Sequence, residues 1–369
     1  MIVVFYILAA ALVWISYRSF RGGLHYLRYF KQELAKPKSD YAPFVTVIAP
    51  CKGLDEDLQQ NLDALLTQGY REYEVIFVTD SRSDPALSII KPLVQLNPAR
   101  SRLIFASAAT DSSQKVENLR EAVVHADDRS EVFVFVDSDA RPSSNWLRDL
   151  IAPLADEKVG ASTGYRWFIS KKFTFASEMR SVWNASIASA LGPNRKSNFC
   201  WGGSTAVRRD VFERLGVRDK WRGTLSDDFT VTRLVKEAGL EIYFVPQALT
   251  PSIESCSLSE LFEFTTRQMK ITRVYAPHLW ASAFFGSGLF TLVMSTALLI
   301  VIFSKANDVN VAVAMLTITL VTIFSTGKSW IRLNGVRLVL SKYEIRLRRQ
   351  FLSQITLWAI TPPLSRESD

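Results

Sequence analysis

The chain has 369 residues, a formal net charge of +8, 48% apolar residues and three cysteines. This length suits one sizeable domain with additional segments, and the apolar share is high for a soluble protein. The number and wide spacing of Cys51, Cys200 and Cys256 exclude a disulfide framework and a zinc motif. We interpret them as buried thiols.

The first 17 residues carry no charge, and basic residues follow them at once. A secretory signal carries its basic residues before the apolar run, so the order found here favours a retained anchor. We therefore predict a transmembrane anchor over residues 1–17 and a basic juxtamembrane linker over residues 18–43. Basic residues mark the cytoplasmic side of a membrane, which places the N-terminus outside and the linker inside.

Two further charge-free stretches, residues 279–304 and 309–327, approach or exceed the roughly 20 apolar residues that a spanning helix needs. The short charged turn between them then lies outside, and residues 328–369 form a basic cytoplasmic tail. Within this tail, residues 351–364 either lie at the interface or re-enter the membrane. The basic residues of the tail are Lys328, Arg332, Arg337, Lys342, Arg346, Arg348 and Arg349. The pattern predicts a multi-pass membrane protein with its globular domain on the cytoplasmic side; in a bacterium this would be the inner (cytoplasmic) membrane.

The net positive charge does not indicate nucleic acid binding. Its basic clusters flank the apolar stretches, where anionic lipid head groups are the simpler partner. We therefore expect contacts with anionic lipid and none with nucleic acid.

Residues 44–257 have the pattern of a globular α/β domain. Short β-branched apolar runs at 44–50, 73–80, 102–106 and 132–139 alternate with segments of helical periodicity. This alternation predicts a mostly parallel sheet with helices on both faces. We further expect strands at 159–165 and 241–246, and helices at 173–189 and 227–238.

Acidic residues follow two of these strands. Asp80 ends the second strand, while Asp137 and Asp139 follow the most apolar one. Ligands of parallel sheets bind beyond the carboxyl ends of the strands, and two carboxylates one residue apart can hold Mg²⁺ or Mn²⁺. The competing interpretation is a pair of turn or cap residues.

Asp227 and Asp228 open a predicted helix. Adjacent acids there can be N-caps favoured by the helix dipole, or one of them can be a general base in a cleft. Gly202 and Gly203 form either a tight turn or a point of close approach to a ligand.

An amphipathic segment over residues 258–278 precedes the second apolar stretch. Helical spacing places Arg267, Lys270 and Arg273 on one face. These cations either meet a leaving diphosphate or form a solvated face beside lipid.

Together these motifs resemble the family 2 and family 21 glycosyltransferases of GT-A fold, most closely the ceramide glucosyltransferases and related bacterial glycolipid synthases. The segments that carry the resemblance are VTVIAPCKG, TDSRSDPA, KVENL, DSDARP, GGSTAVRRD and SDDF. The resemblance implies a nucleotide-diphospho-sugar transferase domain with a mixed, mostly parallel sheet, joined to transmembrane helices.

The resemblance also implies roles for individual residues. Asp80 or Asp84, with Lys115, Asn118, Asp137 and Gly203, would bind the nucleotide sugar. Asp137 and Asp139 would hold the divalent cation, Mg²⁺ or Mn²⁺. Asp228 would be the catalytic base, with Asp227 beside it and Arg267 facing the leaving diphosphate. Gln268, Lys270 and Arg273 would lie in the region of the acceptor and the diphosphate. Of the Gln/Arg-x-x-Arg-Trp box that the family places here, only the arginine is present, as Arg267.

The resemblance implies an inverting transfer of a hexose, glucose by analogy, from a UDP-sugar to the hydroxyl of a membrane lipid. Two alternatives remain open. One is a polysaccharide synthase or a polyprenyl-phosphate sugar transferase, and the other is a non-catalytic membrane scaffold of the same fold. A transporter is disfavoured because the three apolar stretches carry no ionisable residue of the kind expected on a translocation path.

Overall fold

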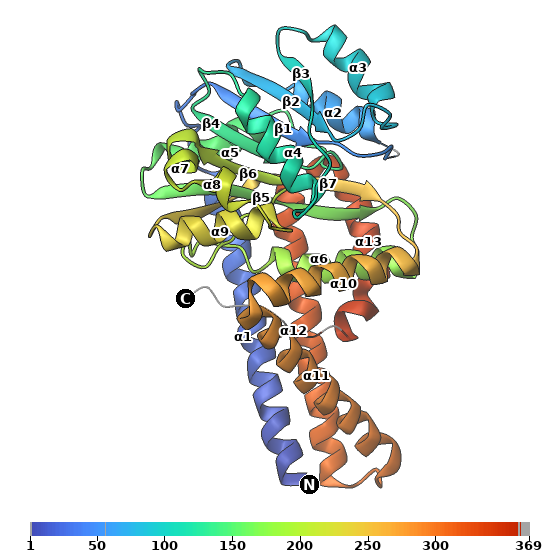
Figure 1. Cartoon of the computed structure of the whole chain (residues 1–369). Coiled ribbons are helices and arrows are strands. Elements are labelled where there is room, and N and C mark those ends of the chain that lie inside the picture. Colours follow the sequence, from blue (N-terminus) through green and yellow to red (C-terminus); the bar gives the residue numbers. More distant parts are fainter. Residues whose placement is uncertain (1, 56, 361, 363–369) are drawn as a thin grey trace. The chain divides into compact units, whose positions relative to one another are not determined.

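The structure is a computed structural model that describes residues 2–55, 57–360 and 362 (Figure 1). The chain divides into two compact units. The first, here called the sheet unit, comprises Gln32–Trp167 and Leu191–Ser252. The second, here called the helical unit, comprises Met1–Lys31, Phe168–Ala190 and Ile253–Asp369.

Strands and helices alternate through the first part of the sheet unit, as the apolar runs predict. The elements are β1 (Val45–Pro50), α2 (Leu58–Leu66), β2 (Tyr73–Thr79), α3 (Leu87–Leu96), β3 (Ser101–Phe105), α4 (Gln114–Ala122), β4 (Val132–Val136), α5 (Trp146–Ile151), β5 (Val159–Ser170), β6 (Ser204–Arg208), α7 (Arg209–Arg214), α8 (Val217–Lys220), α9 (Asp227–Glu237) and β7 (Glu241–Glu254). Short 3-10 turns follow α4 at Val123–His125 and α5 at Ala152–Ala155.

Within the described residues, seven strands form one sheet in the order β3-β2-β1-β4-β6-β5-β7. β1 pairs in parallel with β2 and β4, and β2 pairs in parallel with β3. β6 is antiparallel to both β4 and β5, with Val136 opposite Ser204 and Thr163 opposite Thr205. The carboxyl end of β4, the start of β6 and the second half of β5 therefore share one edge of the sheet.

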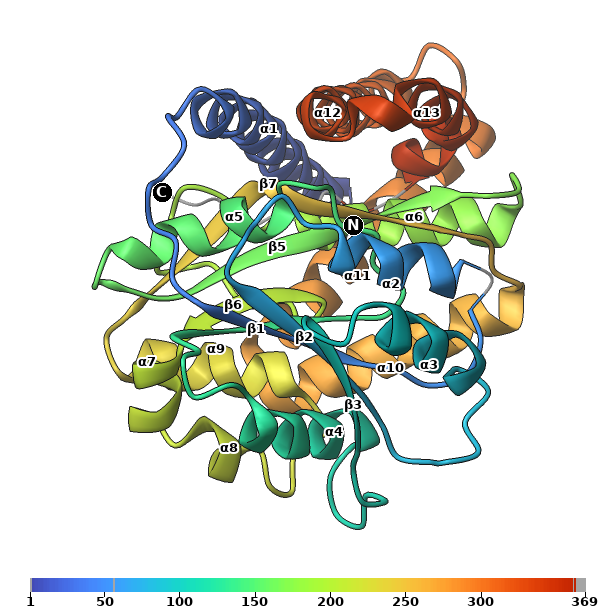
Figure 2. The same cartoon turned by 90° about the horizontal axis from the view of Figure 1, so that it is seen from above.

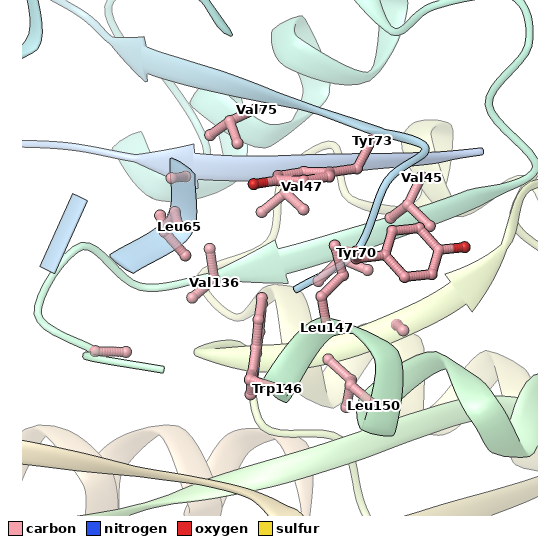
Figure 3. Close-up of a cluster of buried hydrophobic side chains, with 14 of the residues drawn as sticks. Val45, Val47, Leu65, Tyr70, Tyr73, Val75, Val136, Trp146, Leu147 and Leu150 are labelled. Atoms are coloured by element: carbon pink, nitrogen blue, oxygen red, sulfur yellow. The ribbon is translucent and has the colours of Figure 1, made fainter. Parts of the chain in front are cut away.

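Helices cover both faces of this sheet, because successive strand side chains point to opposite sides. Val47 of β1 packs with the apolar residues of α2, α3 and α5, whereas Ile48 packs with those of α4, α7 and α9. Figure 2 shows α4, α8 and α9 together on one side of the strands. On the other face, Trp146 and Leu147 of α5 lie next to the strand residue Val136 (Figure 3). The predicted fold class, α/β with a mostly parallel mixed sheet, agrees with this architecture.

The helical unit contains most of α1 (Ile2–Leu34), α6 (Phe175–Ala188), α10 (Leu258–Tyr275), α11 (Pro277–Phe303), α12 (Val309–Val339) and α13 (Glu344–Ile360), with a 3-10 turn at Ser341–Tyr343. Among the described residues, α1, α11 and α12 are long and apolar enough to cross a membrane. They cover residues 2–17, 279–303 and 309–327, which make up nearly all of the three charge-free stretches seen in the sequence.

Several elements differ in length from the prediction. α1 continues through the predicted linker to Leu34, and α12 continues past residue 327 to Val339. Lysine and arginine are good helix formers, so a basic flank can continue an apolar helix. Two residues of the predicted basic tail, Lys328 and Arg332, are buried on α12 instead of facing solvent. Of the ambiguous segment 351–364, residues 351–360 are helical in α13, while residues 361, 363 and 364 lie outside the described part of the chain.

Two strands are much longer than predicted, and β4 is three residues shorter. β5 reaches Ser170, and β7 reaches Glu254 despite two internal prolines. β7 is at the end of the strand order, where a missing N–H is tolerated. β4 ends at Val136, so Asp137 and Asp139 belong to the turn that follows it.

Candidate functional site

The turn after β4 carries Asp137 and Asp139 at the carboxyl edge of the sheet. Asn61 of α2 fixes this turn from a neighbouring element. Its Nδ2 donates to the Ser138 carbonyl oxygen at 3.1 Å, and its Oδ1 accepts a hydrogen bond from Arg141 Nε at 3.0 Å. The positions of both aspartates are therefore set by side-chain contacts as well as by the strand.

Arg166 of β5 bridges the two aspartates. Its Nη1 lies 2.8 Å from Asp139 Oδ2, and its Nη2 lies 3.5 Å from Asp137 Oδ2. The guanidinium group also lies 5.1 Å from the centroid of the Trp201 ring. Arg166 can reach these groups because β5 runs to the same edge of the sheet as β4.

Lys115 of α4 joins the turn after β4 to the start of α9. Its Nζ lies 2.8 Å from Asp137 Oδ1 and 3.2 Å from Asp227 Oδ1, and it donates to the Gly202 carbonyl oxygen at 3.3 Å. Burial disfavours the charge of Lys115, but the carboxylates of Asp137 and of the Asp227–Asp228 pair outweigh it and raise the lysine pKa above its ordinary value. Lys115 is therefore a fixed cation at physiological pH.

The two acids that open α9 have different environments. Asp227 is buried beside Lys115, and burial raises its pKa to about 6, against the opposing effect of Lys115. Asp228 is partly exposed, and its Oδ2 accepts from the Gly202 backbone N–H at 3.2 Å. Ser226 is the N-cap of α9 and accepts from the Phe229 N–H, which also donates to Asp228 Oδ1 at 2.8 Å. The Ser226 hydroxyl donates to the same Asp228 oxygen, so Asp228 takes part in the cap and in the contact with Gly202.

The chain passes close to these charged groups at Gly202 and Gly203. A Cβ atom on Gly202 would lie 2.4 Å from Asp227 Oδ2 and 2.7 Å from Lys115 Nζ. A Cβ atom on Gly203 would lie 2.2 Å from the Trp201 ring and 2.7 Å from Asp137 Oδ2. Neither glycine has a positive φ, so close approach is the reason for glycine at both positions.

The loop after β2 contains both predicted nucleotide-binding acids. Asp84 is occupied by the backbone: its Oδ1 accepts from the Gly53 N–H at 2.9 Å and from the Ala86 N–H at 2.8 Å. Asp80 follows β2 directly and is partly exposed, and its carboxylate has no hydrogen-bond or ion-pair partner given by the described residues. β2 and β4 flank β1, so the two strand ends are about 10 Å apart across the sheet.

Asn118 lies one turn after Lys115 on α4 and is buried. Its Oδ1 accepts from Gln114 Nε2 at 2.9 Å, and Gln114 in turn accepts from the Ala109 N–H at 2.8 Å. The pair holds the loop that follows β3.

The predicted acceptor and diphosphate residues all lie on α10 in the helical unit. Arg267, Lys270 and Arg273 are exposed, Gln268 is half-buried, and Arg273 lies 5.2 Å from the centroid of the Trp280 ring. Phe264 packs against Phe168 and Trp183, with centroid separations of 5.8 and 5.7 Å. The role of the α10 residues at the aspartates stays a prediction from the sequence.

The structure thus brings together six of the predicted site residues: Lys115, Asp137, Asp139, Gly203, Asp227 and Asp228. Arg166, Asn61 and Trp201 also belong to this cluster, and the sequence reasoning did not single them out. Arg166 and Asn61 stand apart from any repeated acidic or glycine pattern, whereas Trp201 directly precedes the glycine pair Gly202–Gly203 and could have been noticed there. The strand pairing of β5 with β6 is the only signal that would have placed Arg166 here.

The donor atoms present fit a divalent cation. Asp139 Oδ1 is buried and has no hydrogen-bond partner among the described residues, which is unusual for a carboxylate oxygen. The described part of the chain contains no group of three or more His, Cys, Asp or Glu side chains arranged to hold a metal. Two aspartates alone leave most of the coordination sphere of Mg²⁺ or Mn²⁺ to other oxygen ligands.

The mixed, mostly parallel sheet with a cluster of charged residues at one edge is the arrangement that the resemblance to GT-A glycosyltransferases implies. The chain belongs to glycosyl transferase family 21, whose sequence model matches residues 3–360. This family assignment confirms the enzyme class predicted from the sequence.

Ceramide glucosyltransferases are similar to this chain in sequence. Ceramide glucosyltransferase 1 of Caenorhabditis elegans is 22% identical over 241 residues, which are 64% of this chain and 51% of that protein. The ceramide glucosyltransferase of Candida albicans is 29% identical over 123 residues, 30% of this chain and 22% of that protein. The chain thus spans about half the length of the first of these relatives.

The fold is similar to that of the mannosyltransferase PcManGT from Pyrobaculum calidifontis, solved in complex with GDP-Man and Mn²⁺. The TM-score is 0.53 at 19% identity, and the match covers 92% of this chain and 99% of that one. At this identity the likeness concerns the fold.

Proposed function

We propose that the protein is a membrane-bound inverting glycosyltransferase that moves a hexose from a nucleotide sugar to the hydroxyl of a lipid. The observation that carries the proposal is the cluster of Lys115, Asp137, Asp139 and Asp228 at the carboxyl edge of a GT-A-type sheet. The resemblance to ceramide glucosyltransferases supports a UDP-sugar, glucose by analogy, and a ceramide-like acceptor.

The nucleotide would lie along the ends of β1, β2 and β4. Asp80 is better suited than Asp84 to meet it, because Asp84 is already engaged by the Gly53 and Ala86 N–H groups. Asn118 would act through the loop after β3 that it shares with Gln114.

Asp137 and Asp139 would hold the divalent cation. When bound, Mg²⁺ or Mn²⁺ would neutralise charge on the diphosphate that leaves the sugar. Lys115 and Arg166 already place two cations beside these carboxylates, and they would keep the site close to neutral before the donor arrives.

Asp228 is the better candidate for the base. Its neighbour Asp227 is buried and paired with Lys115, whereas Asp228 is partly exposed and held by the Gly202 N–H. In a direct displacement the lipid hydroxyl oxygen bonds to the anomeric carbon as the bond to the diphosphate breaks, and Asp228 takes the hydroxyl proton. Attack opposite the leaving group inverts the anomeric centre.

The three long apolar helices support membrane association, and the basic flanks favour the globular part on the cytoplasmic side. A lipid acceptor leaves the bilayer only at a large free-energy cost, so an anchored enzyme is suited to it. The exposed cations of α10, Arg267 among them, would then face anionic head groups or the diphosphate.

The test is transfer by the full chain in lipid, with UDP-sugars, Mg²⁺ or Mn²⁺, and ceramide, diacylglycerol, sterol or hopanoid acceptors. Asp228→Asn is expected to lower turnover by about 10² to 10⁴, the range for loss of a general base. It should leave binding of the nucleotide sugar intact. Asp219→Asn removes an exposed carboxylate of α8 and is the matched control.

Two outcomes would contradict the proposal. Full activity of Asp228→Asn would exclude it as the base, and binding of the sugar nucleotide with no turnover on any acceptor would indicate a scaffold. A polymeric product would instead identify a polysaccharide synthase.

A further inference from the structure

Two basic residues of α12 are buried where its apolar stretch ends. Lys328 and Arg332 stand four residues apart, hence on one face of the helix, with side chains 7% and 2% exposed. They follow directly on the charge-free residues 309–327. They therefore lie near the level of the lipid head groups if α12 crosses the membrane.

The contacts made by these two cations are to neutral groups. Lys328 Nζ donates to Ser19 Oγ on α1 at 2.9 Å. Arg332 Nη1 donates to the Ala185 carbonyl oxygen at 2.5 Å and to Ser189 Oγ at 2.9 Å, both at the end of α6. The guanidinium of Arg332 also lies 4.3 Å from the centroid of the Trp358 ring on α13.

No carboxylate of the described residues forms an ion pair with either cation. The buried acid Glu178 is on α6 too, but it accepts a hydrogen bond from Gln354 Nε2 at 2.8 Å. It precedes Ala185 by seven residues, which is about 10 Å along a helix. Two buried basic side chains thus lack a counter-ion within the part of the chain that the structure covers.

Hydrogen-bond donors around Arg332 are also unused. Its own Nε, the Trp358 indole Nε1 and the Tyr26 hydroxyl are buried and have no partner given by the described residues. Tyr26 of α1 lies beside α12, because a Cβ on Gly335 would be 3.6 Å from its ring. These three groups, Arg332 Nε, Trp358 Nε1 and the Tyr26 hydroxyl, can all donate, which suits an anionic acceptor.

Buried charge without a counter-ion is strongly destabilising, and ionisable residues near membrane depth usually mark a ligand. The groups here would satisfy an oxyanion with several lone pairs. A phosphate supplies both the charge and the acceptors, and phosphate groups are concentrated at the membrane surface, where basic pockets between helices bind lipid head groups.

We propose that Lys328 and Arg332, with Trp358 and Tyr26, bind the phosphate of an anionic phospholipid between α1, α12 and α13. The lipid would be a structural partner of the helical unit. This inference concerns a site in the helical unit and does not depend on the proposed sugar transfer.

The test uses the full chain in nanodiscs of phosphatidylcholine with increasing phosphatidylglycerol, and native mass spectrometry counts the phosphatidylglycerol retained. The wild type is expected to retain phosphatidylglycerol in preference to phosphatidylcholine. Lys328→Met with Arg332→Met should weaken retention about thirtyfold, given the usual contribution of two basic residues near an anionic surface. Lys342→Met with Arg346→Met is the matched control, because it removes the same charges at the same spacing from exposed positions.

Equal retention by the wild type and the buried double variant would overturn the proposal, as would a wild type without preference for phosphatidylglycerol. If the double variant does not fold, Lys328→Arg with Arg332→Lys keeps both charges and should retain the lipid, while Lys328→Gln alone should weaken retention. Stabilisation of detergent-purified protein by inorganic phosphate to the same extent would indicate a soluble anion in place of lipid. Retention is read without donor or acceptor, so loss of sugar transfer and loss of this lipid site are separate results.

Discussion

Asp227 is a buried acid whose ionisation opposes folding. Burial raises its pKa from 3.8 to about 6, so the folded protein holds this proton more tightly than the unfolded chain does. The stabilisation is complete below about pH 4 and is lost as the pH rises through about 6, by about 3 kcal/mol at most. Asp227→Asn stays neutral throughout. We therefore expect the unfolding midpoint of the wild type to fall relative to the variant between about pH 4 and about pH 7.

Thermal unfolding in detergent at several pH values measures this difference. Asp219→Asn, which removes an exposed carboxylate of α8, is the control. Its unfolding midpoint should change with pH in the same way as that of the wild type. A difference in unfolding midpoint between the wild type and Asp227→Asn that stays constant across this pH range would contradict the prediction. It would mean that the pKa of Asp227 is the same in the folded protein and in the unfolded chain.

At the scale of single residues, the sequence predicts acids and glycines better than their partners. Asp137, Asp139 and Asp228 could be found because acids after apolar strands and at helix starts form a local pattern. Arg166 could not, since its contact with Asp139 depends on β5 running beside β6 to the same edge. Lys328 was assigned to the basic tail because it directly follows the charge-free stretch, whereas its contact in the structure is Ser19, on a helix far away in the sequence.

The loop from Trp201 to the start of β6 passes so close to other groups that a Cβ on either of its glycines would overlap with them. Gly203→Ala would bring a Cβ within 2.2 Å of the Trp201 ring, which is itself buried. We expect a loss of about 1 to 3 kcal/mol in the free energy of unfolding, as for overpacked cores. In Gly202→Ala the new Cβ would contact the ends of the Asp227 and Lys115 side chains, which can move away from it. Because Lys115 is a proposed nucleotide-sugar ligand, this substitution should lower sugar-nucleotide affinity more than the free energy of unfolding.

Unfolding midpoints and sugar-nucleotide titrations separate these two effects. Gly288→Ala in α11 is the control, because a Cβ there meets nothing within 4 Å. If Gly203→Ala were as stable as the wild type, the Trp201 ring would have to shift with no loss of free energy. The ring would then not be held in a fixed position beside Gly203.

Among elements, the order of the strands and of the longer helices was predicted, while the short helices α5, α7 and α8 and the ends of many elements were not. β7 was expected to stop near its first proline, but an edge strand does not need every N–H for pairing. α1 was expected to end with its apolar run, but helix propensity does not change when apolar residues give way to lysine and arginine. Periodicity thus identifies an element, and its contacts decide its length.

For the whole molecule, the order of apolar stretches and basic flanks predicts which parts face each side of the membrane. α11 and α12 are joined by a short turn around Ala306, and the predicted topology places this turn outside and the sheet unit inside. The three cysteines are buried, with exposed fractions of 1%, 3% and 7%, so the native thiols should react little with a labelling reagent. Ala306→Cys and Asp219→Cys each add one exposed thiol, in the turn and on α8 respectively.

A membrane-impermeant maleimide applied to intact cells should label Ala306→Cys at once and Asp219→Cys only after the cells are permeabilised. The wild type should remain unlabelled until it is denatured, because its thiols are inaccessible in the folded state. The reverse pattern would place the sheet unit outside, away from the nucleotide sugars of the cytoplasm. Labelling of both sites in intact cells would mean that α11 and α12 do not cross the bilayer. The anchoring of the enzyme would then depend on α1 and the exposed face of α10.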